Sequence, residues 1–142
     1  MKREDEGTRT LAGKKRILEV SDSEGQRAYN AAICERQGFE VIQACCGDEA
    51  YKLYRKYRPF ALVLTDLYFY DSIPEPSLKK TNTIRDGIRF ALAIRKLAPE
   101  QKIVIHTGAS GLREILPKDL ADVPVLVKPY RISELQSLLE PS

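Results

Sequence analysis

One aspartate, Asp66, stands inside a segment that is otherwise apolar and aromatic, ALVLTDLYFYD at residues 61–71. The leucines, valine and aromatic residues around it are typical of a buried strand. A carboxylate taken out of water without a partner costs several kcal/mol, comparable to the whole stability of a small domain. Asp66 therefore requires a cationic partner, a metal ion or a reaction, which makes it the first candidate functional residue.

Other polar residues stand at the ends of short apolar runs. Ser21 and Asp22 follow RILEV, Thr107 ends KIVIHT, and Lys128 follows VPVLV. If Asp22 and Asp66 lie close together, they repel each other unless a cation sits between them. Lys128 supplies one positive charge, and Mg²⁺ suits an all-oxygen site better than zinc, for which no nitrogen or sulfur ligand set is visible.

The elements that must position these residues alternate between short apolar runs and helical patterns. Runs rich in Val, Ile and Leu predict strands at 16–20, 39–45, 60–65, 102–107 and 123–127. Helical patterns predict helices at 23–37, 48–57, 90–97, near 110–116 and near 132–140. Strict alternation requires crossover connections, which predicts a parallel sheet with helices on both faces. With strand order 2-1-3-4-5, the first and third strands are neighbours, and their polar ends meet at the edge where ligands bind.

Length and composition limit the possible functions. The 142 residues suit a single domain, expected at 14–140 after a disordered tail at 1–13. The net charge of +3 comes from interspersed charges, so we expect no direct nucleic-acid binding. The longest apolar run, FALVL, is far too short to span a membrane, and the first ten residues lack a signal-peptide core. We therefore expect a cytoplasmic protein without membrane contact.

The cysteines and the single histidine are expected to have structural roles. Cys34, Cys45 and Cys46 lack Cys-x-x-Cys spacing, which favours reduced packing residues. A redox switch at the adjacent pair remains an alternative. His106, inside KIVIHTG, is expected to be a partly buried strand residue rather than a ligand, because the chain has no second histidine to share a metal.

Taken together, these segments resemble the receiver domain of two-component response regulators, over about 125 residues from Lys14 to Glu140. The matching pieces are RILEVSDSEGQR, FALVLTDLY, RDGIRFALAIRKL, KIVIHTGAS and VLVKPYRISEL. The pair Lys128-Pro129, of a kind that often carries a cis peptide in this family, is the most specific after Asp66. The resemblance implies a flavodoxin-like (βα)5 three-layer α/β sandwich, with a parallel five-stranded sheet of order 2-1-3-4-5.

The resemblance also implies a role for each site residue. Asp66 would accept a phosphoryl group from a histidine kinase or phosphotransfer protein, and Lys128 would pair first with Asp66 and then with the phosphate. Mg²⁺ would be held by Asp22, Asp66 and the backbone carbonyl of Tyr68. Thr107 would turn its hydroxyl onto a phosphate oxygen and so report the state of the site.

A phosphoacceptor of this kind is a signalling protein and not an enzyme. No residues remain for a DNA-binding or catalytic output domain, so the expected form is a stand-alone receiver that contacts an unknown downstream protein. Homodimerisation is left open. Gly108, directly after the threonine strand, would leave room beside the phosphate.

The sequence departs from the family pattern at several positions. Ser21-Asp22 stands where the family usually has two acids, which lowers the expected Mg²⁺ affinity. Gly87 follows Asp66 by 87 − 66 = 21 positions instead of roughly eight, which implies an inserted loop at about 68–85. That loop is either a tolerated surface insertion or a lid over the site. Val125 stands where many members carry an aromatic switch residue.

Three alternatives remain, the first of which rests on Ser21 and the long loop. The first is a phosphorylation-independent pseudo-receiver that acts as a protein interaction module. The second is a flavodoxin-type fold with incidental polar strand ends. The third, a haloacid dehalogenase-like phosphatase, is disfavoured because Tyr68 stands where that chemistry needs a second acid.

Overall fold

Strands and helices alternate along the chain in a computed structural model, which describes residues 13–67, 87–108 and 116–139. The elements are β1 (Arg16–Val20), α2 (Glu24–Arg36), β2 (Glu40–Ala44), α3 (Gly47–Tyr57), β3 (Leu62–Asp66), α4 (Gly87–Leu97), β4 (Ile103–Thr107), the 3-10 helix η3 (Lys118–Leu120), β5 (Val125–Val127) and α5 (Ile132–Leu139). All paired strands are parallel, in the order β2-β1-β3-β4-β5. The predicted flavodoxin-like topology is confirmed.

Element boundaries differ from the predicted ones by a few residues. β3 extends one residue further than predicted and ends at Asp66 itself, and β5 begins two residues later, at Val125. Three predicted features lie wholly or mostly outside the described residues: the tail at 1–13, the inserted loop at 68–85 and the helix near 110–116. These three stay predictions.

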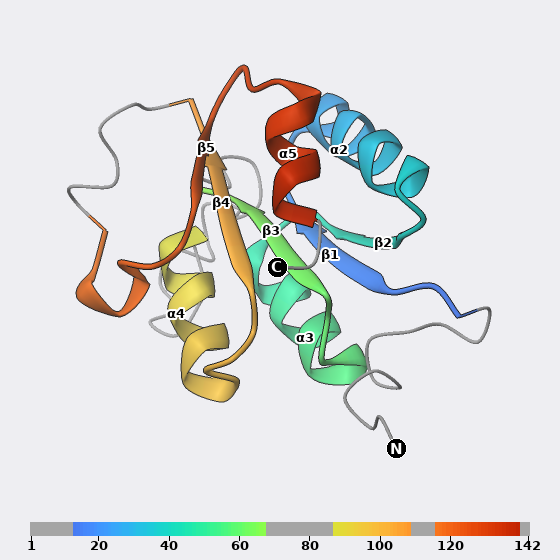
Figure 1. The fold of residues 1–142 in the computed structure, drawn as a ribbon. Helices are drawn as coiled ribbons and strands as arrows, with labels where there is room; N and C mark the ends of the chain where they lie inside the picture. The colour runs from blue at the N-terminus through green and yellow to red at the C-terminus, as the bar shows by residue number, and fades with distance from the viewer. Residues whose placement is uncertain (1–12, 68–86, 109–115, 140–142) are drawn as a thin grey trace.

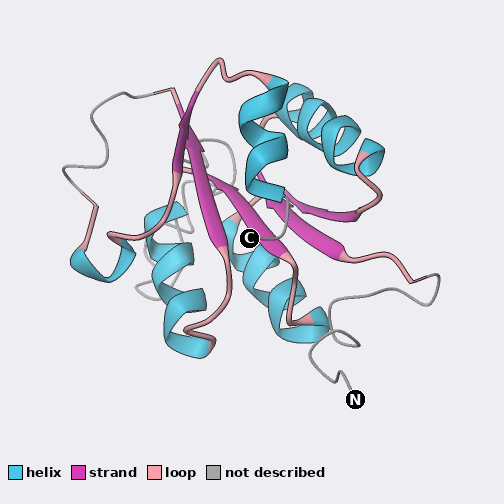
Figure 2. Ribbon diagram, in the orientation of Figure 1, coloured by secondary structure: helices cyan, strands magenta, loops and turns pink. Residues whose placement is uncertain are grey.

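The helices form two layers that sandwich the sheet (Figures 1 and 2). α2 and α5 lie together on one face, and α3 and α4 lie together on the other. Side chains alternate along each strand, so each strand contributes to two apolar clusters, one under each helix pair. All five residues of β3 and all five of β4 are buried, because these central strands are covered on both faces.

The start and end of α2 follow from local sequence signals. Ser23 caps the helix, and its side chain accepts a hydrogen bond from the Gln26 N–H at 3.2 Å. The other end closes with a Schellman motif, in which Gly38 has a φ of +94° and the N–H of Phe39 donates to the Cys34 carbonyl. The cap at Ser23 starts α2 directly after Asp22, the acidic residue predicted to follow β1.

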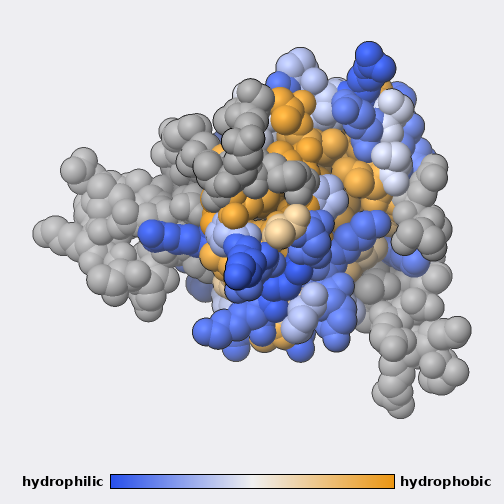
Figure 3. Space-filling view, turned by 60° about the vertical axis from the view of Figure 1, so that its left-hand side comes forward, coloured by the Kyte–Doolittle hydropathy of each residue, from blue (hydrophilic) through white to orange (hydrophobic). Residues whose placement is uncertain are grey.

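The edge of the sheet at β5 carries exposed apolar side chains. Val127 is 43% exposed and Ile132, at the start of α5, is 45% exposed. Figure 3 turns this side of the molecule forward and shows apolar surface gathered above a hydrophilic belt. None of the helices in the described ranges is long and apolar enough to cross a membrane.

Candidate functional site at the end of β3

Asp66 is the last residue of β3 and lies at the carboxyl edge of the sheet. It is 8% exposed, so the carboxylate is buried but still reaches solvent. β1 and β4 flank β3, with Val20 paired to Thr65 and His106 paired to Asp66. The residues that follow β1 and β4 are therefore brought beside this carboxylate.

The Asp66 carboxylate receives hydrogen bonds from three directions. Lys128 Nζ lies 3.3 Å from Oδ1 and 3.4 Å from Oδ2. The N–H of Leu67 donates to Oδ1 at 2.9 Å, and the hydroxyl of Ser21 donates to Oδ2 at 3.3 Å. Burial nevertheless raises the pKa of Asp66, although Lys128, Leu67 and Ser21 all favour the charged form. The charged carboxylate is thus only partly compensated by its neighbours.

Lys128 is positioned by the main chain of the neighbouring strand. Its N–H donates to the carbonyl of Thr107 at 2.7 Å, directly after β5 ends. The Lys128–Pro129 peptide bond is cis, as the resemblance to receiver domains implied. This geometry confirms that residues 66 and 128 meet, although more than 60 residues separate them in the sequence.

Ser21 does more than replace a missing acid. Its hydroxyl accepts a hydrogen bond from the Ser23 N–H at 3.1 Å while donating to Asp66. Its own main chain is held at both ends, by the Ala44 carbonyl at 3.1 Å and by the Arg27 guanidinium at 2.6 Å. Ser21 is therefore a fixed hydrogen-bond donor to the carboxylate, a role that the sequence analysis did not assign to it.

α4 begins in direct contact with the backbone of Asp66. A Cβ atom at Gly87 would lie 2.0 Å from the Asp66 carbonyl oxygen and 3.1 Å from the Cα of Leu67. The Gly87 N–H donates to the Leu67 carbonyl at 2.6 Å. Glycine is required here because the helix start and the strand end approach too closely for any side chain.

Comparison with known proteins places the fold in a known class. No protein-family model and no curated protein sequence matches the chain. Among solved structures, the response regulator TrrA of Thermotoga maritima, determined in complex with Mg²⁺ and BeF, is 26% identical, with a TM-score of 0.69 over 87% of this chain and 94% of that one. The receiver domain of NtrX from Brucella abortus is 24% identical, with a TM-score of 0.68 over 89% of this chain and 99% of that one. A receiver domain protein of Clostridium thermocellum is 21% identical, with a TM-score of 0.70 over 87% of this chain and 90% of that one.

The chain has the fold of response regulator receiver domains.

Within this receiver fold, the remaining predicted residues differ from one another in where they lie. Asp22 is half-buried and directly follows Ser21 in the chain. Thr107 is 2% exposed and stands one position beyond the pair Asp66–His106, so strand alternation directs its side chain to the opposite face. Tyr68, the third proposed metal ligand, lies outside the described residues. A Cβ at Gly108 would meet nothing within 4 Å, which is consistent with open space there.

A buried polar network lies under the receiver site on the α2/α5 face, and the sequence analysis missed it. Glu19 is 1% exposed and accepts hydrogen bonds from Asn30 Nδ2 at 2.9 Å and from Gln43 Nε2 at 3.0 Å. The Tyr130 hydroxyl donates to Asn30 Oδ1, which also accepts from Gln26 at 3.2 Å. A glutamate in the apolar run RILEV was the available signal.

Burial raises the pKa of Glu19 to about 7, although hydrogen bonds from Gln43 and Asn30 favour the charged form. The network joins β1, β2 and α2 to the segment just after Lys128. Displacement of Tyr130 would disturb that network.

His106 is fully buried, more so than expected, and borders the Asp66 carboxylate. Its Nδ1 lies 3.9 Å from Asp66 Oδ1, and its ring packs edge-on against Tyr130 at 6.2 Å between centroids. Burial and then the charge of Lys128 lower the pKa of His106 to about 3, so the ring is neutral. Neither ring nitrogen has a hydrogen-bond partner within the described ranges. His106 is thus a neutral wall of the site.

The prediction that all three cysteines are packing residues is confirmed for the burial of Cys34 and is wrong for Cys45, which is exposed. Cys34 is buried in the core under α2 and α5, and burial raises its pKa to about 12. Cys45 is exposed and Cys46 is half-buried, because both follow β2 after its last paired residue, Ala44. None of the three forms a disulfide.

A surface pocket of about 520 Å³ opens beside the lysine of the site. It is lined by Gln26, Tyr29, Lys128, Pro129 and Tyr130. Tyr29 is 42% exposed, and its hydroxyl donates to the Tyr130 carbonyl at 3.3 Å. The pocket therefore connects the outer surface of α2 with the segment that carries Lys128.

Proposed function

We propose that this receiver accepts a phosphoryl group on Asp66 from a phosphohistidine of a histidine kinase or phosphotransfer protein. The observation that supports this most is the contact between Lys128 Nζ and both oxygens of a buried carboxylate that still reaches solvent. In the transfer, a carboxylate oxygen of Asp66 attacks phosphorus, the bond from phosphorus to the imidazole nitrogen breaks, and an aspartyl phosphate forms.

The residues around Asp66 have distinct parts in this reaction. The Leu67 N–H and the Ser21 hydroxyl hold the carboxylate in place. Lys128 pairs with Asp66 before transfer and with the phosphoryl oxygens after it. Thr107 would have to turn toward the phosphate from its position on the other face, which is the movement that reports phosphorylation.

The donor set fits a hard divalent cation such as Mg²⁺. Asp22 and Asp66 would contribute carboxylate oxygens, and the carbonyl of Tyr68 a third ligand. The position of Asp66 supports this, because its carboxylate lies at the end of β3 and still reaches solvent, from which an ion can bind. When bound, the cation offsets the negative charge that develops on the transferred phosphoryl group.

The signal would pass to a downstream protein by direct contact. The exposed apolar side chains Val127 and Ile132 lie on either side of the segment that carries Lys128. A change at the phosphorylated site therefore reaches a surface suited to binding a protein partner.

Incubation with Mg²⁺ and acetyl phosphate, followed by intact-mass measurement, tests the proposal. We expect a mass gain of one phosphoryl group in the wild type, loss of this gain in Asp66→Asn, and its retention in Asp119→Asn, which changes an exposed aspartate on η3. Phosphate in the Asp66→Asn protein would contradict the assignment.

A phosphorylation-independent interaction module is the second candidate. The observation that favours it is the Ser21 hydroxyl, which occupies the position of a second acid and already bonds to Asp66. A wild type that folds but gains no phosphoryl group, from either acetyl phosphate or a panel of phosphorylated kinases, would select this alternative.

A further inference from the structure

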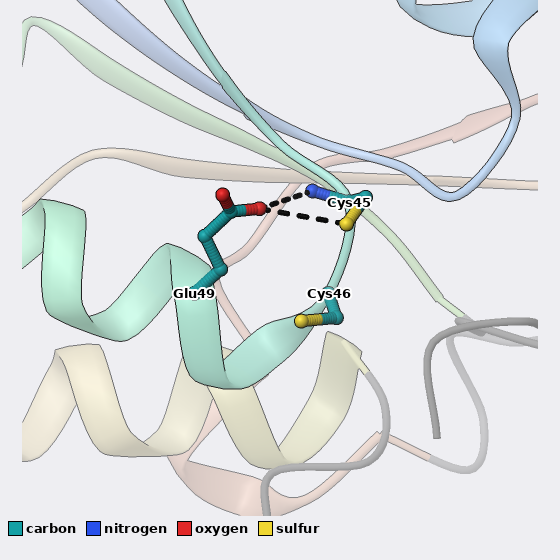
Figure 4. Close-up of side chains that lie close together, drawn as sticks. All are labelled: Cys45, Cys46 and Glu49. Atoms are coloured by element: carbon teal, nitrogen blue, oxygen red, sulfur yellow. Dashed lines mark hydrogen bonds between the residues drawn. The ribbon is translucent and has the colours of Figure 1, made fainter. Parts of the chain in front are cut away.

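A second cluster of metal-binding groups lies at the end of β2, on other residues than the Asp66 site. Cys45 and Cys46 directly follow the strand, and Glu49 stands in the first turn of α3 (Figure 4). One Sγ from each cysteine and one carboxylate oxygen all lie within 4.8 Å of one another. Across the described ranges, no other three His, Cys, Asp or Glu side chains gather this closely.

The contacts within the cluster bring the carboxylate onto the first cysteine. Glu49 Oε1 accepts a hydrogen bond from the Cys45 N–H at 3.0 Å and from the Cys45 thiol at 3.5 Å (Figure 4). Cys46 occupies the N-cap position of α3, yet its side chain makes no capping hydrogen bond. Its sulfur is therefore not committed to the helix terminus.

The spacing of the three ligand atoms is compatible with one tetrahedral cation. With metal–sulfur bonds of about 2.3 Å, two sulfurs on one zinc ion lie about 3.8 Å apart, inside the observed limit. Three protein ligands leave the fourth position to water or another ligand. Cys45 is exposed and Cys46 and Glu49 are not enclosed, so an ion from solvent can reach all three.

The chemistry of the ligands selects the class of ion. Two thiolates and one carboxylate favour a thiophilic divalent ion such as Zn²⁺ over Mg²⁺, which prefers oxygen ligands. Partial burial of its sulfur, and then the Glu49 carboxylate and Cys46, raise the pKa of the Cys45 thiol. A thiol must lose its proton to bind the ion as a thiolate, so binding of the ion releases protons to solvent.

We propose that Cys45, Cys46 and Glu49 bind one thiophilic divalent cation of the zinc class per chain. The site is separate from the proposed Mg²⁺ site and does not depend on phosphorylation of Asp66. The two sites are nonetheless neighbours, because the carbonyl of Ala44, just before Cys45, accepts the N–H of Ser21 at 3.1 Å. A bound ion would fix the β2–α3 junction that holds the main chain of Ser21.

Titration of the reduced protein with Co²⁺, followed by displacement with Zn²⁺, tests this inference. We expect thiolate-to-cobalt charge-transfer absorption that saturates at one equivalent per chain and disappears when Zn²⁺ is added. Cys45→Ser and Cys46→Ser should each weaken binding by at least ~10- to 100-fold, the loss usual even for outer-shell partners of metal sites. Glu49→Gln should weaken it while retaining the charge-transfer band.

Two control variants separate this site from the rest of the molecule. Cys34→Ala removes the buried third thiol and should bind Co²⁺ as the wild type does. Asp66→Asn should also bind Co²⁺ normally, so a failed phosphorylation experiment and a failed metal experiment can be told apart. Circular dichroism checks that each variant is folded. Cys45 is exposed, so we expect its substitution to leave the fold intact.

Four results would overturn the inference. These are the absence of thiolate charge transfer, binding that survives both cysteine substitutions, saturation at half an equivalent, and a disulfide between Cys45 and Cys46 in place of metal binding. Saturation at half an equivalent would indicate an ion shared between two copies of the chain. The disulfide, detected as a loss of two thiols in protein that binds neither Co²⁺ nor Zn²⁺, would indicate a redox pair.

Discussion

The two faces of the sheet bury polar groups in different ways. Under α3 and α4, Gln101 accepts hydrogen bonds from the Tyr54 hydroxyl at 2.7 Å and the Phe60 N–H at 3.1 Å, and it donates to the Phe60 carbonyl at 2.8 Å. Under α2 and α5, His106 has no hydrogen-bond partner within the described ranges for either ring nitrogen, and Glu19 has a strongly raised pKa. On the first face a buried amide has hydrogen-bond partners, whereas on the second face burial shifts the pKa values of Glu19 and His106.

This difference separates stability from chemistry. The buried carboxyl and imidazole groups of the described residues, those of Glu19, Asp66 and His106, lie on the α2/α5 face. The α3/α4 face contributes an apolar core and the close backbone approach at Gly87. Substitutions on the two faces should therefore differ in kind, with plain loss of stability on one and changed pH dependence on the other.

The largest effect is expected on the α3/α4 face, from Gly87→Ala. The new Cβ would lie 2.0 Å from a backbone oxygen, which cannot move as a side chain can. We expect a loss of about 3 kcal/mol or more in the free energy of unfolding, measured by urea denaturation. Gly108→Ala is the matched control, because a Cβ there meets nothing within 4 Å, and an equal loss in both variants would contradict this reading.

His106→Leu should reveal the titration of Glu19. The pKa of Glu19 is about 7 in the folded protein and 4.5 ordinarily, so the folded state holds a proton that the unfolded chain releases between these values. Stability from this group is present at low pH and is lost as pH rises through 7, by roughly 2 to 3 kcal/mol between about pH 5 and pH 8. Asp66, whose pKa is also raised, acts in the same direction.

In the wild type, His106 opposes this trend. Its pKa is about 3 in the folded protein and 6.5 ordinarily, so the unfolded chain takes up a proton that the folded state refuses. Acidification through 6.5 therefore costs stability. We expect a nearly flat stability profile in the wild type and a falling one in His106→Leu, which should also gain about 1 kcal/mol at pH 8 from removal of the unpaired nitrogens. Identical pH profiles of the two proteins would refute the claim that His106 and Glu19 have opposite effects on stability as pH changes.

Glu19→Gln should give the mirror image with a slightly smaller slope. Only the histidine then titrates strongly, so the free energy of unfolding should fall by about 2 kcal/mol from pH 8 to pH 5. Chemical denaturation at a series of pH values measures this. Glu40→Gln, at an exposed position on β2, is the control and should follow the wild type.

The smallest effect is expected from the exposed ion pair that joins α4 to the turn before β5. Arg95 Nη1 lies 3.0 Å from Asp122 Oδ1, but the Asp122 side chain is 70% exposed. Arg95→Ala should change the free energy of unfolding by less than about 0.5 kcal/mol, because water and salt screen such pairs. A loss above ~1 kcal/mol would show that the α3/α4 face depends on charge as well as on apolar packing.

The sequence predicted what depends on backbone pattern. Alternation of apolar runs and helical stripes was enough to predict a parallel sheet, and the resemblance to receiver domains supplied the strand order. The meeting of parallel strand ends was then enough to bring Lys128 to Asp66. The partners of Glu19 were not predictable in the same way, because they depend on the rotation of α2 and on the register with β2. The exposure of Cys45 likewise depends on where β2 stops, which differed from the predicted end by one residue.

The hydrogen bond between the Gly87 N–H and the Leu67 carbonyl has a consequence for the length of the chain between them. The nitrogen of Gly87 and the carbonyl oxygen of Leu67 lie 2.6 Å apart, so the two ends of the connection at residues 68–86 are held together whatever the number of residues between them. Doubling a flexible closed loop costs only about 0.6 kcal/mol of closure entropy. Insertions and deletions between residues 68 and 86 can therefore accumulate at little thermodynamic cost, while the carboxylate and the helix that abuts it keep their places.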